Sequence, residues 1–420
     1  MNNSPETKFM NIPVVIIGAG IAGLTTSYYL KKNNIDHIII EKGEVANTWI
    51  KERWDNFYLV NPNWAIKIPE FGFGTKHFPS NNPDEFLSKK QTIKLLKSYS
   101  KFIGSEIYEN EFVNSIKKDG SKYKITTSLR EIISDKVVLA NGAFGDPYIP
   151  EISSRINNNF YQIHSADYKN YRQLPEGGVL VVGSGQSGAQ IAEDLLMEGK
   201  KVYLALSKCG RRLRRYRGKD SSWWNYKMGL FDKTVNDVPL ENRWKCSPHT
   251  SGANGGHEIN LIDLSEKGLN LLGSVKDCFD NKLIFNNDLY ENLKFSDEFA
   301  INWTKNVDKF IKKNNLKVPY EKISKDTRIE SFKIIHPLKI NIKPTITSII
   351  WSTGFRYNYD WIDFVITDEN GFPDQKRGLT KHEGFYFMGL QWMHSSKSAQ
   401  FIGVGEDAEY VVNELKSKIV

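Results

Sequence analysis

Two stretches of the chain share one pattern of apolar and polar positions. Each has a short β-branched run, then glycines, then a helical pattern with one apolar face, then a second apolar run: residues 14–17, 22–32 and 38–40, and residues 179–182, 189–197 and 202–206. Runs this short and this apolar are typical of buried parallel strands. The order strand, helix, strand therefore predicts the same parallel crossover unit twice.

The rest of the pattern predicts further strands and helices around these units. Helices are expected at residues 83–102 and after residue 403, and strands at residues 112–116, 123–127, 136–140, 348–351 and 385–388. A chain of 420 residues is long enough for two domains, or for one domain inserted in another. The fold class we predict is α/β, with two Rossmann-like, doubly wound dinucleotide-binding domains.

The first unit carries glycines at G-x-G-x-x-G spacing. Gly18 makes a tight turn, Gly20 lets the backbone approach a pyrophosphate, and Gly23 lets helix and strand pack closely. The N–H groups of the following helix N-terminus then face the pyrophosphate. Glu41 ends the second strand, next to Lys42, where a carboxylate accepts hydrogen bonds from ribose hydroxyls. This unit is predicted to bind a dinucleotide.

The second unit repeats the spacing at Gly183, Gly185 and Gly188, with Gln186 and Ser187 between them. Its second strand ends in Ser207 instead of an acidic residue, and Arg211 and Arg212 follow soon after. A carboxylate would repel a 2′-phosphate, whereas Ser and Arg hydrogen-bond it. We therefore predict NADPH in the second unit and FAD in the first. A solvated basic loop is the alternative for the arginines.

Other candidate cofactor contacts lie between and after the two units. The aromatic segment 45–64 supplies Thr48, Trp49 and Arg53 as contacts to a flavin ring or its phosphates, with ordinary loop packing as the alternative. Gly142 follows a predicted strand, in a turn beneath the nucleotide. Near the end of the chain, Gly405, Glu406 and Asp407 open a predicted helix whose N-terminus would stabilise negative charge on a reduced flavin.

Composition narrows the class of protein further. The net charge of +8 is spread widely apart from the arginine cluster, which argues against nucleic-acid binding. Three cysteines, far apart and without a C-x-x-C, disfavour a disulfide scaffold, a metal site and a dithiol redox centre. No run of eighteen apolar residues is present, so we expect no membrane span and a cytoplasmic protein.

Five motifs together resemble the class B flavoprotein monooxygenases, the group of flavin-containing, N-hydroxylating and Baeyer–Villiger enzymes with their bacterial relatives. They are GAGIAG at Gly18, GSGQSG at Gly183, FYQIHSADY at residues 160–168, STG at Ser352 and GVGEDA at residues 403–408. The resemblance covers nearly the whole chain. It implies a discontinuous FAD domain (residues 1–150 and 340–420) with an inserted NADPH domain (residues 151–339). We expect the aromatic-rich part of that insertion, about residues 211–335, to be a substrate lid or a packed core.

The same resemblance implies a function. NADPH would reduce FAD, O2 would add to form a C4a-(hydro)peroxyflavin, and one oxygen atom would pass to N, S or C of a small-molecule substrate. Phe160 stands where the family has a glycine before His164, so ketone oxygenation is not implied. No residue stands out as a catalytic acid or base. The alternatives are an NADPH-dependent flavoprotein reductase that passes electrons to another acceptor, and a nucleotide-binding redox sensor.

Overall fold

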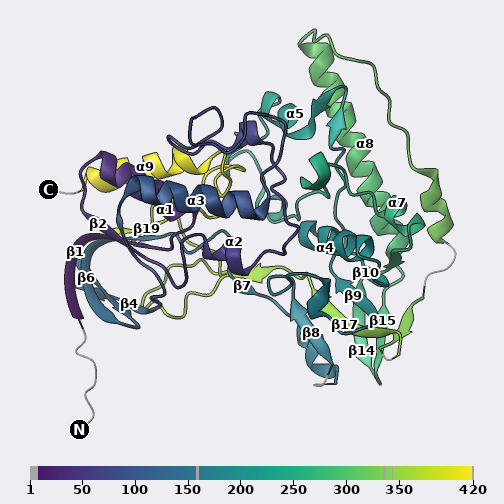
Figure 1. Cartoon of the computed structure of the whole chain (residues 1–420), viewed down its shortest axis with the longest axis horizontal. Coiled ribbons are helices and arrows are strands. Elements are labelled where there is room, and N and C mark those ends of the chain that lie inside the picture. Colours follow the sequence, from purple (N-terminus) through teal and green to yellow (C-terminus); the bar gives the residue numbers. More distant parts are fainter. Residues whose placement is uncertain (1–7, 158–159, 334–336, 343, 419–420) are drawn as a thin grey trace.

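The computed structural model describes residues 8–157, 160–333, 337–342 and 344–418, which form two lobes lying side by side (Figure 1). The first and last elements described, β1 and α9, both belong to the first lobe, and the middle of the chain forms the second (Figure 1). Within these ranges no helix is long and apolar enough to cross a membrane. Both lobes combine parallel strands with helices, which confirms the predicted α/β class.

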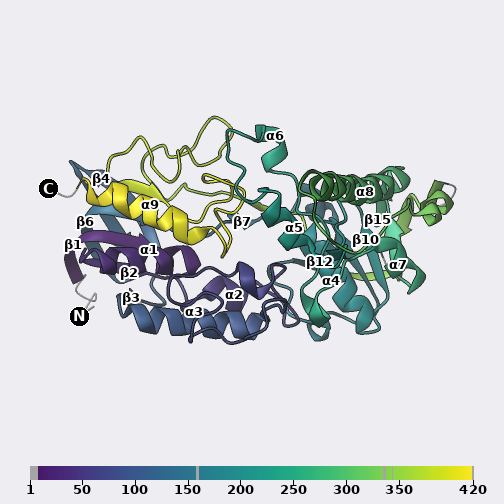
Figure 2. The ribbon, with the colours of Figure 1, turned by 90° about the horizontal axis from the view of Figure 1, so that it is seen from above.

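The first lobe is built on a seven-stranded sheet in the order β3-β2-β1-β6-β5-β4, with β19 also paired to β6. Strands β3, β2, β1, β6 and β19 are parallel, and β5 and β4 are antiparallel to their neighbours. Helix α1 packs against α9 and α3 (Figure 2). The elements are β1 (Lys8–Ile17), α1 (Ile21–Lys32), β2 (His37–Ile40), α2 (Asn47–Lys51), α3 (Lys89–Ile103), β3 (Glu106–Tyr108), β4 (Val113–Asp119), β5 (Lys122–Thr127), β6 (Arg130–Leu139), β19 (Phe385–Phe387) and α9 (Val404–Lys416).

The second lobe is built on a five-stranded parallel sheet in the order β13-β10-β9-β17-β8. Side chains of β9 alternate between two cores: Val179 and Val181 face one, Leu180 and Val182 the other. This burial on both faces explains the continuous apolar run of β9. The sheet and its helices are β8 (Tyr161–His164), β9 (Gly178–Val182), α4 (Gln186–Met197), β10 (Val202–Ala205), α7 (Leu261–Glu266), β13 (Asn270–Leu272), α8 (Leu289–Lys313) and β17 (Ile346–Trp351).

Smaller elements complete the two lobes. Strands β14 (Val275–Phe279), β15 (Lys282–Phe285) and β16 (Lys339–Asn341) form an antiparallel sheet, and β11 (Arg215–Tyr216) pairs with β12 (Lys219–Asp220). Helices α5 (Ser221–Lys227) and α6 (Leu240–Arg243) follow β12. Short 3-10 turns are η1 (Asn63–Ala65), η2 (Glu151–Arg155), η3 (Tyr171–Gln173), η4 (Ala253–Gly255) and η5 (Thr327–Lys333).

The strand pairings place the end of the inserted segment later than residue 339. Strand β17 lies between β9 and β8 in the second sheet, so the chain returns to the first lobe only after Trp351. The sequence pattern identified β17 as a strand but did not show which sheet it joins, because a buried parallel strand looks the same in either sheet. The two lobes are then joined by β7 (Asp146–Pro147) and β18 (Phe355–Arg356), which pair antiparallel.

The segment 211–335 is not one insertion. Strand β13, which lies within this segment, pairs with β10 in the second sheet. The 25-residue helix α8, which was not predicted from the sequence, crosses the outer side of the lobe (Figure 1). Trp224 and Trp303 are buried in a small core of their own. Parts of the segment both before and after α5 reach the first lobe: the Arg214 guanidinium donates to the Val60 carbonyl oxygen at 2.9 Å. Thr234 pairs with Ser395, and Trp244 stacks on Phe372 with ring centroids 4.5 Å apart.

Candidate functional site

The two glycine loops have the same backbone geometry. Gly18 has φ +108°, and a Cβ there would lie 2.4 Å from the Ala140 carbonyl oxygen. Gly183 has φ +95°, and its Cβ would lie 2.5 Å from the Ser352 carbonyl oxygen. Both conditions require glycine. Each first glycine therefore lets the loop turn beneath the end of a neighbouring strand.

The third glycine of each loop is required for packing between helix and strand. A Cβ on Gly23 would meet the Gly18 carbonyl oxygen at 1.9 Å, and one on Gly188 would meet the Gly183 carbonyl oxygen at 1.9 Å. The first turns of α1 and α4 can lie this close to their loops only without a side chain. The predicted structural roles of the first and third glycines are those the geometry gives.

The central glycines are different, because the protein itself does not require them. A Cβ on Gly20 would meet nothing within 4 Å, and one on Gly185 would meet only the Cβ of Cys246, at 3.9 Å. Both residues are also the N-caps of their helices, and neither helix has a side-chain cap. Open space beside uncapped N–H groups is what a pyrophosphate needs. The residues present therefore fit a dinucleotide at both loops.

The end of the second strand is hydrogen-bonded to the glycine loop at both sites. In the first lobe a strand-end side chain bonds the loop backbone, and in the second a loop side chain bonds the strand-end backbone. In the first lobe, Glu41 is buried and its carboxylate accepts hydrogen bonds from the N–H groups of Ala19 (2.7 Å) and Gly43 (2.9 Å). Burial raises the pKa of this carboxyl, and the two N–H groups oppose that shift. In the second lobe, the Ser184 hydroxyl accepts from the Ser207 N–H and donates to the Ser207 carbonyl, both at 3.0 Å.

This difference leaves different groups facing a ribose. Glu41 keeps unused lone pairs beside the first loop, whereas the Ser207 side chain is exposed beside the second, where no acidic side chain ends the strand. Lys42 and Lys208, each next along the chain, are also exposed. The role of Glu41 in fixing the loop was not predicted from the sequence; its contact to a ribose remains a prediction.

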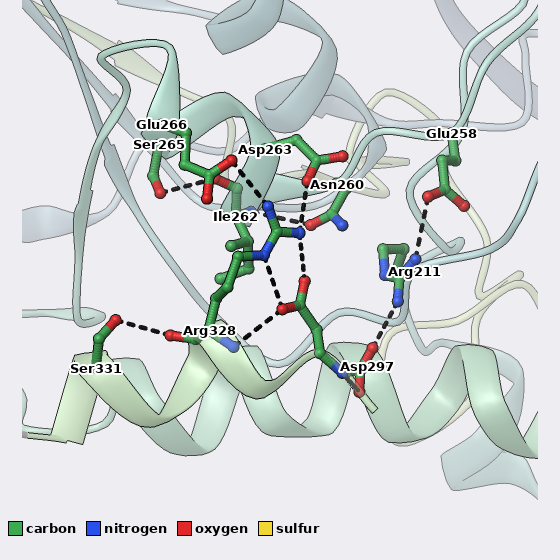
Figure 3. Close-up of polar contacts among 11 residues, drawn as sticks. Arg211, Glu258, Asn260, Ile262, Asp263, Ser265, Glu266, Asp297, Arg328 and Ser331 are labelled. Atoms are coloured by element: carbon green, nitrogen blue, oxygen red, sulfur yellow. Dashed lines mark hydrogen bonds and ion pairs between the residues drawn. The ribbon is translucent and has the colours of Figure 1, made fainter. Parts of the chain in front are cut away.

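Arg211 has partners that the sequence did not suggest. Its guanidinium is buried and pairs with Glu258 (3.1 Å) and Asp297 (2.5 Å), the latter from α8 (Figure 3). The Asp326 backbone N–H donates to the same Asp297 carboxylate, which connects Arg211 to the ion pairs of Arg328 (Figure 3). Because the Arg211 guanidinium already has two carboxylate partners, its geometry favours a structural role over a contact to the 2′-phosphate.

Arg212, the next residue, lies in the opposite situation. Its Nε is buried without a hydrogen-bond partner, and the side chain makes no ion pair with any residue that the structure describes. Burial, followed by the charge of nearby Arg214, lowers its pKa to about 10. Arg214 itself is paired with Asp220 at 2.6 Å. Arg212 is half-buried, and its Nε has no partner in the described chain, so Arg212 remains the predicted phosphate contact.

Arg53 is a second arginine without a carboxylate partner in the described chain. It donates to the Glu52 carbonyl oxygen at 2.8 Å, and its guanidinium lies 5.7 to 5.9 Å from the rings of Trp49, Phe57 and Phe144. Burial lowers its pKa. Trp49 and Thr48 lie on α2, whose N-cap Ala46 donates its N–H to the Ala19 carbonyl in the first glycine loop. The three predicted residues thus lie together beside that loop.

The remaining predicted contacts are arranged less uniformly. Gly142 adopts φ +115°, as a turn at the end of β6 requires. Gly405 lies in the first turn of α9, and the buried Asp407 has its Oδ1 3.6 Å from the Arg377 Nε, while burial raises its pKa. Glu406 is exposed and pairs with Lys397 (2.8 Å), which also pairs with Asp232. The structure therefore gives Glu406 a role in a surface ion pair.

Around the second loop, Gln186 was among the predicted contacts, whereas His249, Thr250 and Gln190 were not predicted from the sequence. The His249 ring is buried and shares a 2.5 Å hydrogen bond with the Ser184 carbonyl oxygen. Gln186 and Gln190 both donate to the Thr250 carbonyl oxygen, leaving their own side-chain oxygens buried without partners. Segment 249–250 thus lies against the loop and the first turns of α4. No sequence motif marks it, because the contact joins residues far apart in the chain.

Two sheets, each carrying between two parallel strands a glycine loop open at its central glycine, define the fold of enzymes that bind two dinucleotides. A family model described as pyridine nucleotide-disulphide oxidoreductase matches residues 15–222. The uncharacterised oxidoreductase CzcO of Bacillus subtilis is 32% identical over 96% of this chain and 99% of its own length. A CzcO-like oxidoreductase of Geobacillus kaustophilus is 30% identical over 96% and 98%. The chain belongs to this family of CzcO-like oxidoreductases.

Solved structures agree on the fold. A flavin-containing monooxygenase from Stenotrophomonas maltophilia has a TM-score of 0.64 at 16% identity, covering 98% of this chain and all of the other. OTEMO, solved in complex with FAD and NADP, has a TM-score of 0.55 at 16% identity, with 97% and 85% covered. The predicted resemblance to the class B flavoprotein monooxygenases is confirmed at the level of the fold.

Proposed function

We propose that the chain is an FAD- and NADPH-dependent monooxygenase that transfers one oxygen atom of O2 to a small-molecule substrate. The observation that carries the proposal is the pair of glycine loops, each with an open central glycine at an uncapped helix N-terminus. One such loop would serve an enzyme with a single dinucleotide. Two loops in separate lobes supply one site for a nicotinamide donor and one for a flavin acceptor.

The cofactors are assigned to the lobes by the ends of the second strands. FAD belongs in the first lobe, where Glu41 suits a ribose without a phosphate. NADPH belongs in the second, where the strand ends in Ser207 and the unpaired Arg212 follows. The residues of the first lobe would hold FAD, which would supply hydride acceptance from NADPH and, in its reduced form, reactivity toward O2. We further propose a cytoplasmic location.

The chain's own part in this reaction is to bind and to orient. Arg53, held among three aromatic rings between α2 and the connection at Phe144, supplies positive charge beside the first lobe's cofactor. The aromatic rings around it restrict water near that charge. Trp244, stacked on Phe372, holds segment 230–244 against the first lobe, where it forms a cover between the lobes. We propose segment 230–244 as the substrate lid; it is a small part of the segment 211–335, for which a lid or a packed core was expected.

The test is incorporation of isotope-labelled dioxygen into a product. Purified protein loaded with FAD would be supplied with NADPH and labelled O2 in the presence of pools of amines, thioethers and phenols. We expect one labelled oxygen atom per product molecule and one in water. NADPH consumption without label in any product, together with reduction of an added electron acceptor, would instead identify a flavoprotein reductase. Failure to bind FAD would exclude both enzymes.

A further inference from the structure

Two of the three cysteines meet beside the second glycine loop. Cys209 is buried just after β10, and Cys246 is exposed just after α6. The Cys209 Sγ lies 3.3 Å from the Ser247 carbonyl oxygen, and the Cys246 Sγ lies 3.6 Å from the Lys208 carbonyl oxygen. Each thiol therefore hydrogen-bonds the backbone next to the other cysteine. The fold therefore places Cys209 and Cys246 side by side, although they are far apart in the sequence.

The two thiols also interact directly, and they are chemically unequal. A hydrogen bond between them raises the pKa of Cys209, which burial raises further, and the same hydrogen bond lowers the pKa of Cys246. The thiolate is the reactive form of cysteine. The exposed Cys246 is thus the nucleophile of the pair, and the buried Cys209 is placed to resolve an oxidised Cys246.

The position of this pair connects it to the coenzyme site. A Cβ added at Gly185 would lie 3.9 Å from the Cβ of Cys246, with no other atom of the described chain within 4 Å beyond its own neighbours. Cys209 follows Ser207 by two residues, at the strand end where the 2′-phosphate is expected. Three residues after Cys246, His249 and then Thr250 hold the loop and α4. A change in the bond between the two sulfur atoms would act on all of these contacts.

We propose that Cys209 and Cys246 form a reversible disulfide that weakens NADPH binding at the second glycine loop. The oxidant is a peroxide. The Cys246 thiolate attacks one oxygen of H2O2 and becomes a sulfenic acid, releasing hydroxide that takes up a proton to give water. The Cys209 sulfur then attacks the sulfenic sulfur, a second water leaves, and the disulfide forms. In sum, two thiols lose two electrons and two protons, and one H2O2 becomes two waters.

Closing the disulfide alters the space a coenzyme needs. The sulfur atoms move from hydrogen-bond contact to a bond of about 2.05 Å. Segment 246–250 is drawn toward the turn at residues 207–209, between which the adenosine end of NADPH would lie. Oxidation is expected to weaken coenzyme binding by about fivefold or more, the lower range of coupling between sites. This effect rests on the proposed NADPH site; disulfide formation does not.

The experiment treats the FAD-loaded protein with H2O2, with dithiothreitol, or with both in turn. The mass of a tryptic digest and the number of alkylated thiols report the disulfide, and titration with NADP+ reports binding. Cys278 is the matched control, because it is buried in β14 and burial raises its pKa. We expect peroxide to join Cys209 to Cys246 and weaken binding, dithiothreitol to reverse both changes, and Cys278→Ser to respond as the wild type does.

Each result decides one part of the inference. Cys209→Ser and Cys246→Ser should each bind NADP+ with the same affinity before and after peroxide treatment, whereas the wild type should not. Alkylation of both Cys209 and Cys246 after peroxide treatment would overturn the disulfide. The same loss of NADP+ affinity on peroxide treatment in Cys246→Ser as in the wild type would also overturn it. A disulfide that forms without changing NADP+ affinity would overturn the effect on binding. If reduced protein binds FAD but not NADP+, the proposed function fails, while the mass measurement still decides the disulfide.

Discussion

At the scale of single residues, the three glycines of each loop have different roles, although the motif consists of the same residue type at all three positions. Gly18 and Gly183 are required by a positive φ and by a carbonyl oxygen beneath them, whereas Gly20 and Gly185 face open space. The sequence predicted all six glycines because their spacing is local. The motif also separated the central glycine, which faces the ligand, from the two required by the turn and by packing. It did not identify the Ala140 and Ser352 carbonyl oxygens that the first glycines approach, because these atoms come from elsewhere in the chain.

This distinction predicts separable effects of single methyl groups. Gly20→Ala should fold and lose flavin, and Gly185→Ala should keep flavin and bind NADP+ about tenfold more weakly or worse. Absorbance of bound flavin and titration with NADP+ measure the two losses. Gly18→Ala is the control, because strain at φ +108° and a 2.4 Å contact should destabilise the fold itself. Loss of flavin in Gly185→Ala would reverse the assignment of the two sites.

His249 makes stability depend on pH. Burial, then the charge of Arg211, lowers its pKa to about 4 from the usual 6.5. The unfolded chain therefore binds more protons between these values, so stability falls as pH drops through this window, by about 2 kcal/mol at pH 5. We expect the urea midpoint of the wild type to fall further from pH 7 to pH 5 than that of His249→Gln. Equal shifts in both proteins would show that His249 is protonated without cost.

At the scale of elements, the sequence predicted the two crossover units, the strands β4, β5, β6, β17 and β19, and the helix α9, although β1 begins at Lys8 instead of residue 14. Other boundaries and elements were not predicted. Helix α3 begins at Lys89 instead of residue 83, because Ser88 and Gln91 cap it reciprocally. Helix α8 was missed although Leu289, Leu293, Ala300 and Val307 lie along its buried face. Its apolar period of three to four residues is visible in the sequence, but this region was interpreted from its aromatic content alone.

The network between β10 and α8 predicts opposite behaviour for two neighbouring arginines. Arg211→Met would leave Glu258 and Asp297 without their partner in a buried site, which costs about 3–5 kcal/mol. We expect a lower urea midpoint and an unchanged preference for NADPH over NADH. Arg212→Met removes an unpaired cation instead, so its midpoint should stay or rise while the preference falls. If the ratio of kcat/KM for NADPH to that for NADH falls in Arg211→Met and not in Arg212→Met, then Arg211 contacts the 2′-phosphate.

At the scale of the whole molecule, two strands carry the chain between the lobes, and they are paired to each other. A Cβ on Gly145 would lie 1.9 Å from the Arg356 carbonyl oxygen, so the close approach of β7 and β18 depends on this glycine. Segment 230–244 gives a second contact between the lobes through Thr234 and Trp244. None of these contacts was predicted, since each joins distant segments with no motif of their own.

The paired connection predicts a variant in which binding and electron transfer separate. Gly145→Val would force β7 from β18 and change how the lobes face each other, without touching either glycine loop. We expect FAD and NADP+ to bind as in the wild type, and anaerobic reduction of the flavin by NADPH to slow by about tenfold or more, since misplacement by about 1 Å can cost more. Reduction at the wild-type rate would show that the connection does not orient the lobes.

The position of β19 and α9 in the first lobe sets an order of events on the ribosome. Strands β8 to β17, with the helices between them, leave the ribosome as one continuous stretch, so the second lobe can close as soon as residue 351 emerges. The first lobe, begun earlier, lacks β19 beside β6 and α9 beside α1 until the last residues are made. At about 5–20 residues per second, its apolar sheet waits on the order of ten seconds or more for its cover. The part of the protein synthesised first is therefore the part completed last, and for that interval it is the natural client of a chaperone.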